Sequence, residues 1–337
     1  MPAPPPISIL IPVRNGAAHL GEAIDSLESQ TLPDFEVIVV DDGSTDDTPE
    51  MLHQWAGRDP RVRVLRQAPE GIVKALEVGR AEARGDFLAR MDADDVADPR
   101  RLALQFAHMR DSPGTWALGS QVEYFPDEVV RDGARRYQAW MNASLGSEAI
   151  ERELFVECPL AHPTFFLRAE AVAAIGGYRD VGWAEDYDLL LRLWMAGGRL
   201  DRVPEVLLHW RESPDRLSRR HDRYSPEAFR RCKVHYLIEG FGLKDRACLI
   251  WGAGPVGKAF SRAFAAEGIR VAGFSEVDPR KIGQEIHGAP VFDTRGALNQ
   301  AGVLHLCAVG QPGARATLRS LLVEAGRVEM RDFVAVA

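Results

Sequence analysis

The sequence predicts an α/β protein with two domains, of which the first is the larger. The chain has 337 residues, which is about twice the usual length of one domain. Short β-branched apolar runs alternate with segments of helical periodicity over the first 110 residues, and the pattern returns after a glycine-rich turn near residue 252. A hydrophobic share of 46% and a charged share of 27% are typical of a globular protein.

The first half of the chain predicts a parallel sheet with helices on both faces. Apolar β-branched runs of four to seven residues are typical of buried parallel strands. Leu20, Ala23, Ile24 and Leu27 share one face of a helix. The predicted strands are Ile7–Val13, Phe35–Val40, Val62–Leu65 and Asp86–Met91, and the predicted helices are Ala17–Gln30, a helix from about Pro49, Gly71–Ala83 and Pro99–Arg110.

The second half predicts a linker and a smaller domain. We divide the chain into a first domain at 1–210, an arginine-rich linker at 211–245 with one amphipathic helix, and a second domain at 246–337. The linker helix is predicted at about Pro226–Glu239. The second domain opens with a strand at Cys248–Trp251, a Gly-x-Gly-x-x-Gly turn, a helix to about Glu267 and a strand at Arg270–Phe274.

Charge and composition exclude several classes of protein. The net charge is −8, and residues 246–337 carry 11 Lys and Arg against 8 Asp and Glu, which leaves −11 for residues 1–245. An acidic first domain argues against nucleic-acid binding. Four scattered cysteines indicate reduced thiols. Because neither a signal peptide nor a membrane span is recognisable, we expect a cytoplasmic protein, with peripheral contact at the inner face of the membrane left open.

Two groups of aspartates follow predicted strands. Asp41 and Asp42 end the second strand, and Asp92, Asp94 and Asp95 follow the fourth. Ligands of parallel sheets bind beyond the carboxyl ends of the strands. Turn chemistry alone explains one such group, but five neighbouring carboxylates repel one another unless a cation compensates. The pattern therefore favours a cation site at this edge of the sheet.

Four segments resemble one enzyme family when they are taken together. They are ISILIPVRNGAAHLGEAIDSLESQTLPDFEVIVVDDGSTDDT (7–48), GIVKALEVGRAEARGDFLARMDADD (71–95), HPTFFLRAEAVAAIGGYRD (162–180) and AEDYDLLLRLWMAG (184–197). In this order and spacing they resemble the family 2 glycosyltransferases, and the resemblance covers about residues 1–210. It implies a GT-A fold with a mixed, mainly parallel sheet, and an enzyme of the hexosyltransferase type that uses a nucleotide-diphosphate sugar, with polysaccharide biosynthesis as the usual setting.

The resemblance implies a donor site at the first aspartates. Asp42 resembles the residue that accepts a hydrogen bond from the uracil imide of a UDP-sugar, which a carboxylate can do. Pro12, Val13 and Asn15 would line the same base pocket. Asp41 would then be a structural neighbour or a ribose contact.

The Asp-Ala-Asp-Asp run resembles the DXD motif of this family. The resemblance implies that Asp92 faces the ribose or the sugar, and that Asp94 or Asp95 binds Mg²⁺ or Mn²⁺, with the choice between these two left open. Carboxylate oxygens are the ligands that both cations prefer. The cation would neutralise charge on the leaving nucleoside diphosphate.

Glu185 and Asp186 resemble the family's ED pair, in which the aspartate is the catalytic base. One carboxylate must take the proton of an acceptor hydroxyl as this attacks the anomeric carbon, and a single displacement inverts that carbon. Residues i and i+3 share a helix face, so we expect Glu185 and Asp188 to lie together and Asp186 to point elsewhere. The alternative for Asp186 is a carboxylate that stabilises a helix N-terminus. His162 lies in a segment that resembles the acceptor side of the family, although a lone histidine is more often structural.

The chain departs from the family pattern at two places. Glu77 stands where the family often has Asn, which puts a donor contact in doubt. Arg211 is not followed two residues later by the family's His, so another group must assist the diphosphate or the cation. His209, Arg211, Arg216 and Arg219 are the candidates, and the alternative for all four is a solvated basic segment.

The second domain carries a nucleotide-binding pattern. Gly252, Gly254 and Gly257 form Gly-x-Gly-x-x-Gly between a strand and a helix, and Glu276 follows the next strand, where it can bind a ribose hydroxyl. About 92 residues correspond to half of a dinucleotide fold, and the segment 273–292 resembles small Rossmann-like domains appended to sugar-modifying enzymes. A nucleotide-binding module, a packing domain without a ligand and a redox domain all stay open.

Two further readings of the whole chain compete with a glycosyltransferase. One is an NAD(P)-dependent oxidoreductase whose first domain only binds a nucleotide sugar. The other is a catalytically silent nucleotide-sugar-binding protein, which would not need both the DXD and the ED pair. We expect a nucleotide-sugar donor and a saccharide or lipid-linked acceptor as partners, while the oligomeric state stays open.

Overall fold

The computed structural model describes residues 4–213, 216–311 and 313–337, which form two compact units. The described parts of residues 4–150, Pro159–Val181 and Glu185–Arg220 form the first unit. Glu151–Cys158, Gly182–Ala184 and the described part of His221–Ala337 form the second. The predicted linker therefore contributes residues to both units.

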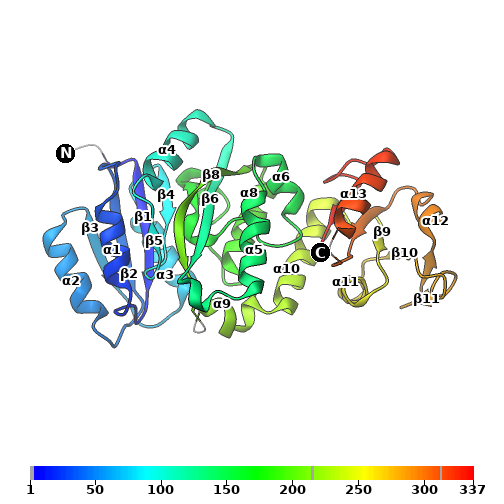
Figure 1. Cartoon of the computed structure of the whole chain (residues 1–337), viewed down its shortest axis with the longest axis horizontal. Coiled ribbons are helices and arrows are strands. Elements are labelled where there is room, and N and C mark those ends of the chain that lie inside the picture. Colours follow the sequence, from blue (N-terminus) through cyan, green and yellow to red (C-terminus); the bar gives the residue numbers. More distant parts are fainter. Residues whose placement is uncertain (1–3, 214–215, 312) are drawn as a thin grey trace. The chain divides into compact units, whose positions relative to one another are not determined.

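A mixed, mainly parallel sheet forms the centre of the first unit, as predicted. Its eight strands of described residues run in the order β3-β2-β1-β4-β7-β6-β8-β5, and only β7 and β5 are antiparallel to their neighbours (Figure 1). The strands are β1 Ile7–Val13, β2 Glu36–Asp41, β3 Val62–Arg66, β4 Phe87–Arg90, β5 Val96–Ala97, β6 Thr115–Phe125, β7 Phe166–Arg168 and β8 Arg199–Arg211.

Helices surround this sheet and connect its strands. They are α1 Leu20–Glu28, α2 Thr48–Arg58, α3 Ile72–Glu82, α4 Arg101–Asp111, α5 Asp132–Ala143, α6 Ser147–Glu153, α7 Ala169–Ala174, α8 Glu185–Met195 and α9 Leu217–Arg220. The predicted strands β1 to β4 are confirmed to within one residue at each end. Helix α1 begins three residues later than predicted, because the N–H groups of His19 and Leu20 first form a turn on the carbonyl of Gly16.

The core explains why β1 and β2 are mainly apolar. Ile9, Ile11, Val37 and Val39 belong to the same buried cluster as Leu20 and Ile24 of α1. The alternate residues Leu10, Ile38 and Val40 face α3, where Gly79 lies against them. Since successive side chains of a strand point to opposite faces, both faces of these strands are covered. The carboxyl ends of the strands, where the aspartates lie, are left as the place where polar side chains gather.

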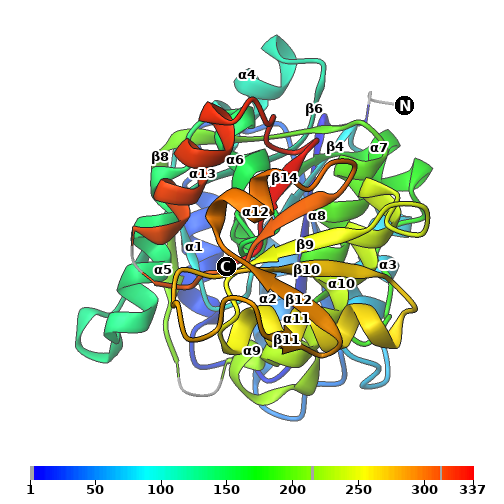
Figure 2. The same cartoon turned by 90° about the vertical axis from the view of Figure 1, so that its right-hand side faces the viewer.

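The second unit contains a smaller, mostly parallel sheet, which Figure 2 shows in yellow to red. Its described strands are β9 Cys248–Trp251, β10 Val271–Ser275, β11 Glu285–Ile286, β12 Ala289–Phe292, β13 Leu304–Cys307 and β14 Phe333–Ala335, in the order β11-β12-β10-β9-β13-β14. Its helices are α10 Pro226–Phe241, α11 Pro255–Ala266, α12 Thr294–Leu298 and α13 Ala314–Glu324. The parallel order β12-β10-β9-β13-β14 is that of a dinucleotide-binding fold up to its fifth strand.

Helix α10 confirms the predicted amphipathic helix and extends it by two residues. The Ser225 side chain caps its start by accepting a hydrogen bond from the Ala228 N–H, and Gly242 ends it in the left-handed conformation that favours glycine. None of the helices in the described part of the chain has both the length and the hydropathy of a membrane span.

Candidate active site

The ends of β1 and β2 bring the predicted base-pocket residues together. The Asp42 N–H donates to the carbonyl of Val13, and the Asn15 N–H donates to Ser44 Oγ at 2.9 Å. Asn15 Oδ1 accepts from the Thr45 N–H at 2.8 Å. Asn15 has a φ of 54°, a left-handed conformation that asparagine tolerates better than most residues. Val13, Asn15 and Asp42 therefore share one small loop structure, which Pro12 of β1 adjoins.

Asp41 and Asp42 have different surroundings. Asp41 Oδ1 accepts from the Ser44 N–H at 2.8 Å, so part of this carboxylate builds the turn. Its buried Oδ2 lies 3.5 Å from Arg66 Nε and accepts no hydrogen bond from any described residue. Asp42 Oδ1 accepts from Gln67 and Glu70, and Oδ2 accepts from the Gly71 N–H at 2.9 Å. A carboxylate offers about four acceptor positions, so Asp42 retains capacity for one more donor.

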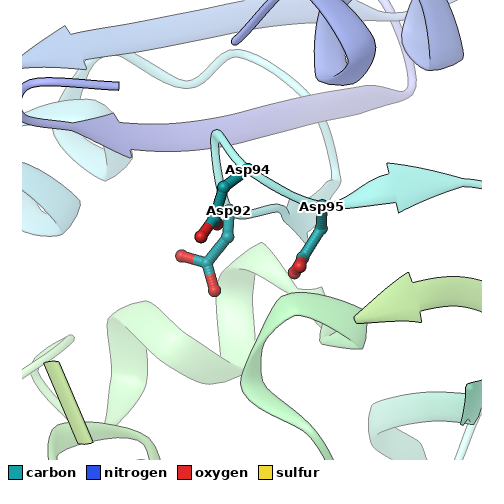
Figure 3. Close-up of side chains that lie close together, drawn as sticks. All are labelled: Asp92, Asp94 and Asp95. Atoms are coloured by element: carbon teal, nitrogen blue, oxygen red, sulfur yellow. The ribbon is translucent and has the colours of Figure 1, made fainter. Parts of the chain in front are cut away.

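Three aspartates after β4 form the one cluster of possible metal ligands among the described residues. One oxygen from each of Asp92, Asp94 and Asp95 lies within 4.8 Å of the others. Figure 3 shows that the three side chains leave one loop and point into the same space. Burial and the negative charge of Asp92 raise the pKa of Asp94, and burial with the charges of Asp92 and Asp94 raises that of Asp95 well above its usual range.

This cluster fits a divalent cation. Asp95 is 1% exposed, and its Oδ2 is buried and accepts no hydrogen bond from any residue that the structure describes. A buried carboxylate oxygen without a donor is costly unless a positive charge compensates it. Hard oxygen ligands in a tight group are those that Mg²⁺ and Mn²⁺ prefer. Asp94 and Asp95 would hold the ion beside Asp92, and Asp95 Oδ2 is the oxygen that accepts no hydrogen bond from the described residues.

Strand β8 shapes the acidic loop from far along the chain. Val96 and Ala97 of β5 pair with His209 and Leu208 of β8, which brings Arg211 to the loop. The Arg211 N–H donates to Asp95 Oδ1 at 2.8 Å, and Arg211 Nε donates to the Asp94 carbonyl at 2.7 Å. Arg211 Nη2 lies 2.8 Å from Glu22 Oε2. Arg211, which we predicted as a donor contact, thus fixes the aspartates, and a donor contact stays a prediction.

Of the other basic candidates, Arg216 is the one whose charge acts on the acidic cluster. Its positive charge lowers the pKa of both Asp94 and Asp95. Its guanidinium stacks 4.2 Å from the ring centroid of Trp210. His209 Nδ1 lies 3.3 Å from Glu123 Oε2, and Arg219 Nη2 pairs with Glu212 at 2.6 Å. Residues 214 and 215 of this segment lie outside the described residues.

The acceptor-side residues meet at the start of α8. Glu185 and Asp188 are 1% and 0% exposed, whereas Asp186 is partly exposed, as expected of residues on different faces of the helix. Burial and the charge of Glu185 raise the pKa of Asp186 to about 7. Near neutral pH such a carboxylate is matched to proton transfer. The Tyr187 N–H donates to Asp186 Oδ1 at 2.7 Å and fixes the side chain.

His162 lies beside this pair. Its Nδ1 is 3.8 Å from Glu185 Oε1, and its Nε2 is 3.0 Å from the Tyr178 hydroxyl. Burial and the charge of Arg90 lower the pKa of His162 well below its usual range, so the ring is neutral at physiological pH. His162 therefore belongs to a buried polar group around Glu185 and has the contacts of a positioning residue.

Sequence reasoning missed Arg90, which is central to the site. Arg90 is the last residue of β4, is 3% exposed, and lies with Nη2 2.5 Å from Asp92 Oδ1. Its charge lowers the pKa values of Asp94, Asp186 and His162. The same buried cation thus acts on the acidic cluster and on the acceptor side, which places both near it. An arginine at the end of a buried apolar strand was the available signal.

Glu77 has a structural role that explains the departure from the family pattern. Its carboxylate pairs with Arg80 at 2.7 Å and accepts the Tyr178 N–H at 2.6 Å. A Cβ on Gly177 would lie 2.4 Å from Glu77 Oε1, and the φ of Gly177 is 71°, so only glycine suits this turn. Glu77 therefore holds the turn that delivers Tyr178 to His162.

The predicted glycines of the second unit have the geometry of a dinucleotide turn. Gly252 has a φ of 105°, and a Cβ on Gly257 would lie 2.0 Å from the Gly252 carbonyl oxygen. Gly254 precedes α11 and is unobstructed. Glu276 accepts the N–H groups of Val277 and Asp278 and pairs with Lys281 at 2.9 Å. The glycines are thus brought together, but Glu276 is already bonded within the chain.

A cavity of about 340 Å³ lies between α10 and α11 within the second unit. Its lining is mainly apolar and includes Pro255 and Val256 in the first turn of α11. Arg230, Lys233 and Glu157 add charged groups to the lining. The cavity therefore lies beside the glycine-rich turn.

Comparisons with known proteins agree with this arrangement. The family model described as glycosyl transferase family 2 matches residues 8–176. The chain is 30% identical over 226 residues to the putative glycosyltransferase EpsE of Bacillus subtilis (strain 168), covering 66% of this chain and 78% of that protein.

Two solved structures share the fold. Residues 1–349 of TarS from S. aureus, in complex with UDP-GlcNAc, have a TM-score of 0.55 and 18% identity, over 69% of this chain and 66% of that one, which is just under two thirds. The mannosyltransferase PcManGT from Pyrobaculum calidifontis, in complex with GDP-Man and Mn²⁺, has a TM-score of 0.51 and 22% identity, over 97% of this chain and 83% of that one. With the family match over half of its residues, this chain belongs to glycosyl transferase family 2 and is a glycosyltransferase.

Proposed function

We propose that the first unit transfers a sugar from a UDP-sugar to an acceptor hydroxyl, with inversion at the anomeric carbon and a divalent metal at the donor. One observation carries this proposal. The charge of the buried Arg90 lowers the pKa of Asp94, in an aspartate cluster that fits a cation, and also that of Asp186, which is partly exposed and has a pKa of about 7. The two functions of such a transferase, holding a diphosphate and taking a proton, therefore have adjacent candidate groups.

The donor site would use the loop at the ends of β1, β2 and β4. Val13, Asn15 and Asp42 would hold the base, with the spare acceptor position of Asp42 taking the uracil imide N–H. Asp92 would face the ribose or sugar, and Asp94 and Asp95 would hold the ion. A bound cation would offset the charge of the leaving diphosphate. Arg211 keeps this loop in place, and Arg216 supplies positive charge that acts on Asp94 and Asp95.

The acceptor step would use Asp186 as general base. Its carboxylate takes the proton of the acceptor hydroxyl while the hydroxyl oxygen bonds to the anomeric carbon and the bond to the diphosphate oxygen breaks. The charge of Glu185 raises the pKa of this base, and His162, which is bonded to the Tyr178 hydroxyl, lies beside Glu185. Attack opposite the leaving group gives inversion.

For the acceptor, we propose a saccharide or a lipid-linked saccharide in polysaccharide biosynthesis, which rests on the family resemblance. The cytoplasmic location and the three-part division at residues 210 and 245 likewise stay predictions.

The second unit supports a second proposal, that it binds a nucleotide. The observation that favours it is the close approach of Gly257 to Gly252 next to the cavity between α10 and α11. Such turns let a diphosphate reach the N-terminus of the following helix. If NAD⁺ were that nucleotide, the oxidoreductase alternative would gain support.

The experiment that tests both proposals is calorimetric titration of the full chain with UDP, GDP and NAD⁺, each with and without Mn²⁺. We expect UDP to bind only when Mn²⁺ is present. Binding of GDP in place of UDP would contradict the choice of nucleobase but not the family. If neither nucleoside diphosphate bound while NAD⁺ did, the proposal of a metal-dependent UDP-sugar site in the first unit would fail, and the proposal of a nucleotide site in the second unit would gain support.

A further inference from the structure

Two short segments that lie within residues 1–210 of the sequence belong to the second unit. They are Glu151–Cys158 and Gly182–Ala184. The first segment ends four residues before His162, and the second ends two residues before Asp186. Both proposed acceptor-side residues therefore follow a segment that is anchored elsewhere.

Helix α10 anchors the first segment through a buried lysine and an aromatic contact. Lys233 is 8% exposed, and its Nζ donates to the Val156 carbonyl at 2.5 Å, with the Val336 carbonyl at 3.5 Å. The rings of Phe155 and Phe241 meet edge to face with centroids 5.7 Å apart. Because burying an ammonium group is costly unless it is bonded, this lysine specifies one position of the Val156 backbone.

The opposite end of the same segment is bonded to α13. The Glu153 carboxylate pairs with Arg315 and with Arg319, each at 2.6 Å. Arg319 Nη2 also donates to the Arg152 carbonyl at 2.8 Å. Two elements of the second unit thus fix the segment before the chain turns back toward His162.

Helix α10 also anchors the second segment, from its exposed side. Arg231 Nη2 donates to the Gly182 carbonyl at 3.0 Å. The rings of His235 and Trp183 lie with centroids 5.5 Å apart. Arg231 and His235 are one helical turn apart, so one face of α10 holds two consecutive residues of the segment. The next residues in the chain are Ala184, Glu185 and Asp186.

Resting on the proposed function of Asp186, we propose that α10 is a positioning element of the transferase site. Its Arg231 and His235 hold the approach to Asp186, and its Lys233 and Phe241 hold the approach to His162. The contacts go mainly to backbone carbonyls and therefore fix chain position. Since a displacement of about 1 Å can cost about 100-fold in rate, a fixed approach to the base matters for turnover.

The variant Arg231→Met tests this in the full chain. Arg231 is exposed, so its replacement leaves no buried unpaired charge. We expect kcat to fall about 10- to 100-fold while the affinity for UDP in the presence of Mn²⁺ stays within about twofold. Arg231→Lys keeps a donor for the Gly182 carbonyl and should recover most of the rate.

Lys244→Met is the matched control, because Lys244 is an exposed cation that pairs with Glu239 near the other end of α10. Equal kcat values for Arg231→Met and Lys244→Met would overturn the proposal. A parallel fall of kcat, UDP affinity and Tm in Arg231→Met, without recovery in Arg231→Lys, would indicate a general structural role and also overturn it.

Hydrogen exchange separates this inference from the proposed function. Amides 184–190 should exchange faster in Arg231→Met than in Lys244→Met, while amides of β1 and β2 keep their rates. This readout needs no substrate, so it decides the inference even if the unmodified protein fails to bind UDP. Unchanged exchange at 184–190 would contradict it.

Discussion

The carboxyl edges of the two sheets carry acidic residues in the same kind of place but in opposite electrostatic states. Asp95 follows β4 and has one buried oxygen without a donor in the described part of the chain, and its pKa is raised. Glu276 follows β10 and is bonded by Val277, Asp278 and Lys281. Burial alone would raise the pKa of Glu276, but these bonds lower it below its ordinary value.

The difference shows that an acidic residue at a strand end does not by itself mark a ligand site. What distinguishes the two edges is whether the protein already compensates the charge. Asp95 lies among like charges and gains from a cation, whereas Glu276 already has a cation and two backbone donors. Perturbed and uncompensated groups are better indicators of function than position alone.

The largest effect on activity should come from Asp186→Asn, at the start of α8 in the first unit. Loss of the base should reduce transfer about 10²–10⁴-fold while UDP binding in Mn²⁺ stays unchanged. Initial rates of sugar transfer or of slow donor hydrolysis measure the first, and calorimetry measures the second. Turnover close to that of the unmodified protein would remove Asp186 from its proposed role.

Asp95→Asn should lower the affinity for UDP in the presence of Mn²⁺ about 10- to 100-fold. The amide keeps an oxygen for the Arg211 N–H but loses the charge that a cation needs. Titration of UDP with and without Mn²⁺ measures this. Asp98→Asn is the matched control, because Asp98 is a nearby carboxylate bonded to Arg100. An equal loss in both variants would speak against a metal role for Asp95.

The pH dependence of transfer should follow Asp186, whose pKa is about 7. A base must be deprotonated, so kcat/KM should rise about tenfold per pH unit below 7 and level off above it. Burial raises this pKa from its ordinary value of 3.8 to about 7 in the folded state, so stability falls as the pH rises between these two values and stays low above 7. Asp186→Asn should therefore raise Tm more at pH 8 than at pH 5. A flat rate profile between pH 5.5 and 8 would conflict with this assignment.

The smallest effect should come from Glu276→Gln. The amide oxygen can still accept the two backbone N–H groups, and the ion pair with Lys281 is worth about 1 kcal/mol or less. We expect a small change in Tm and no change in transfer. A large loss of nucleotide binding in this variant would show that the two edges are more alike than their contacts indicate.

The sequence predicts the parts of the fold whose pattern is local. β1 to β4 are apolar runs bounded by turns, and Asp41, Asp42, Asp92, Asp94 and Asp95 directly follow β2 and β4, so their place at the sheet edge could be read from spacing. The positions of β6, β7 and β8 depend on antiparallel and long-range pairing, which periodicity does not reveal.

The contacts that tune the site were less accessible to sequence reasoning. In the sequence Arg90 looks like any charged residue, because its burial beside Asp92 is visible only in the structure. Glu77 reads as a lost donor contact until its bond to the Tyr178 N–H is seen. The anchoring of 151–158 and 182–184 depends on bonds to backbone carbonyls, which leave no trace in side-chain type.

The bond from the Arg211 N–H to Asp95 spans 116 residues of sequence and has a consequence for the newly made chain. A ribosome that has translated as far as β5 has produced all three aspartates, but Arg211, whose N–H fixes Asp95, is still more than a hundred codons away. The loop of the proposed cation site therefore gains this contact only after β8 has been made and can pair with β5. Until then the acidic loop lacks the backbone bond that holds Asp95 in the folded protein.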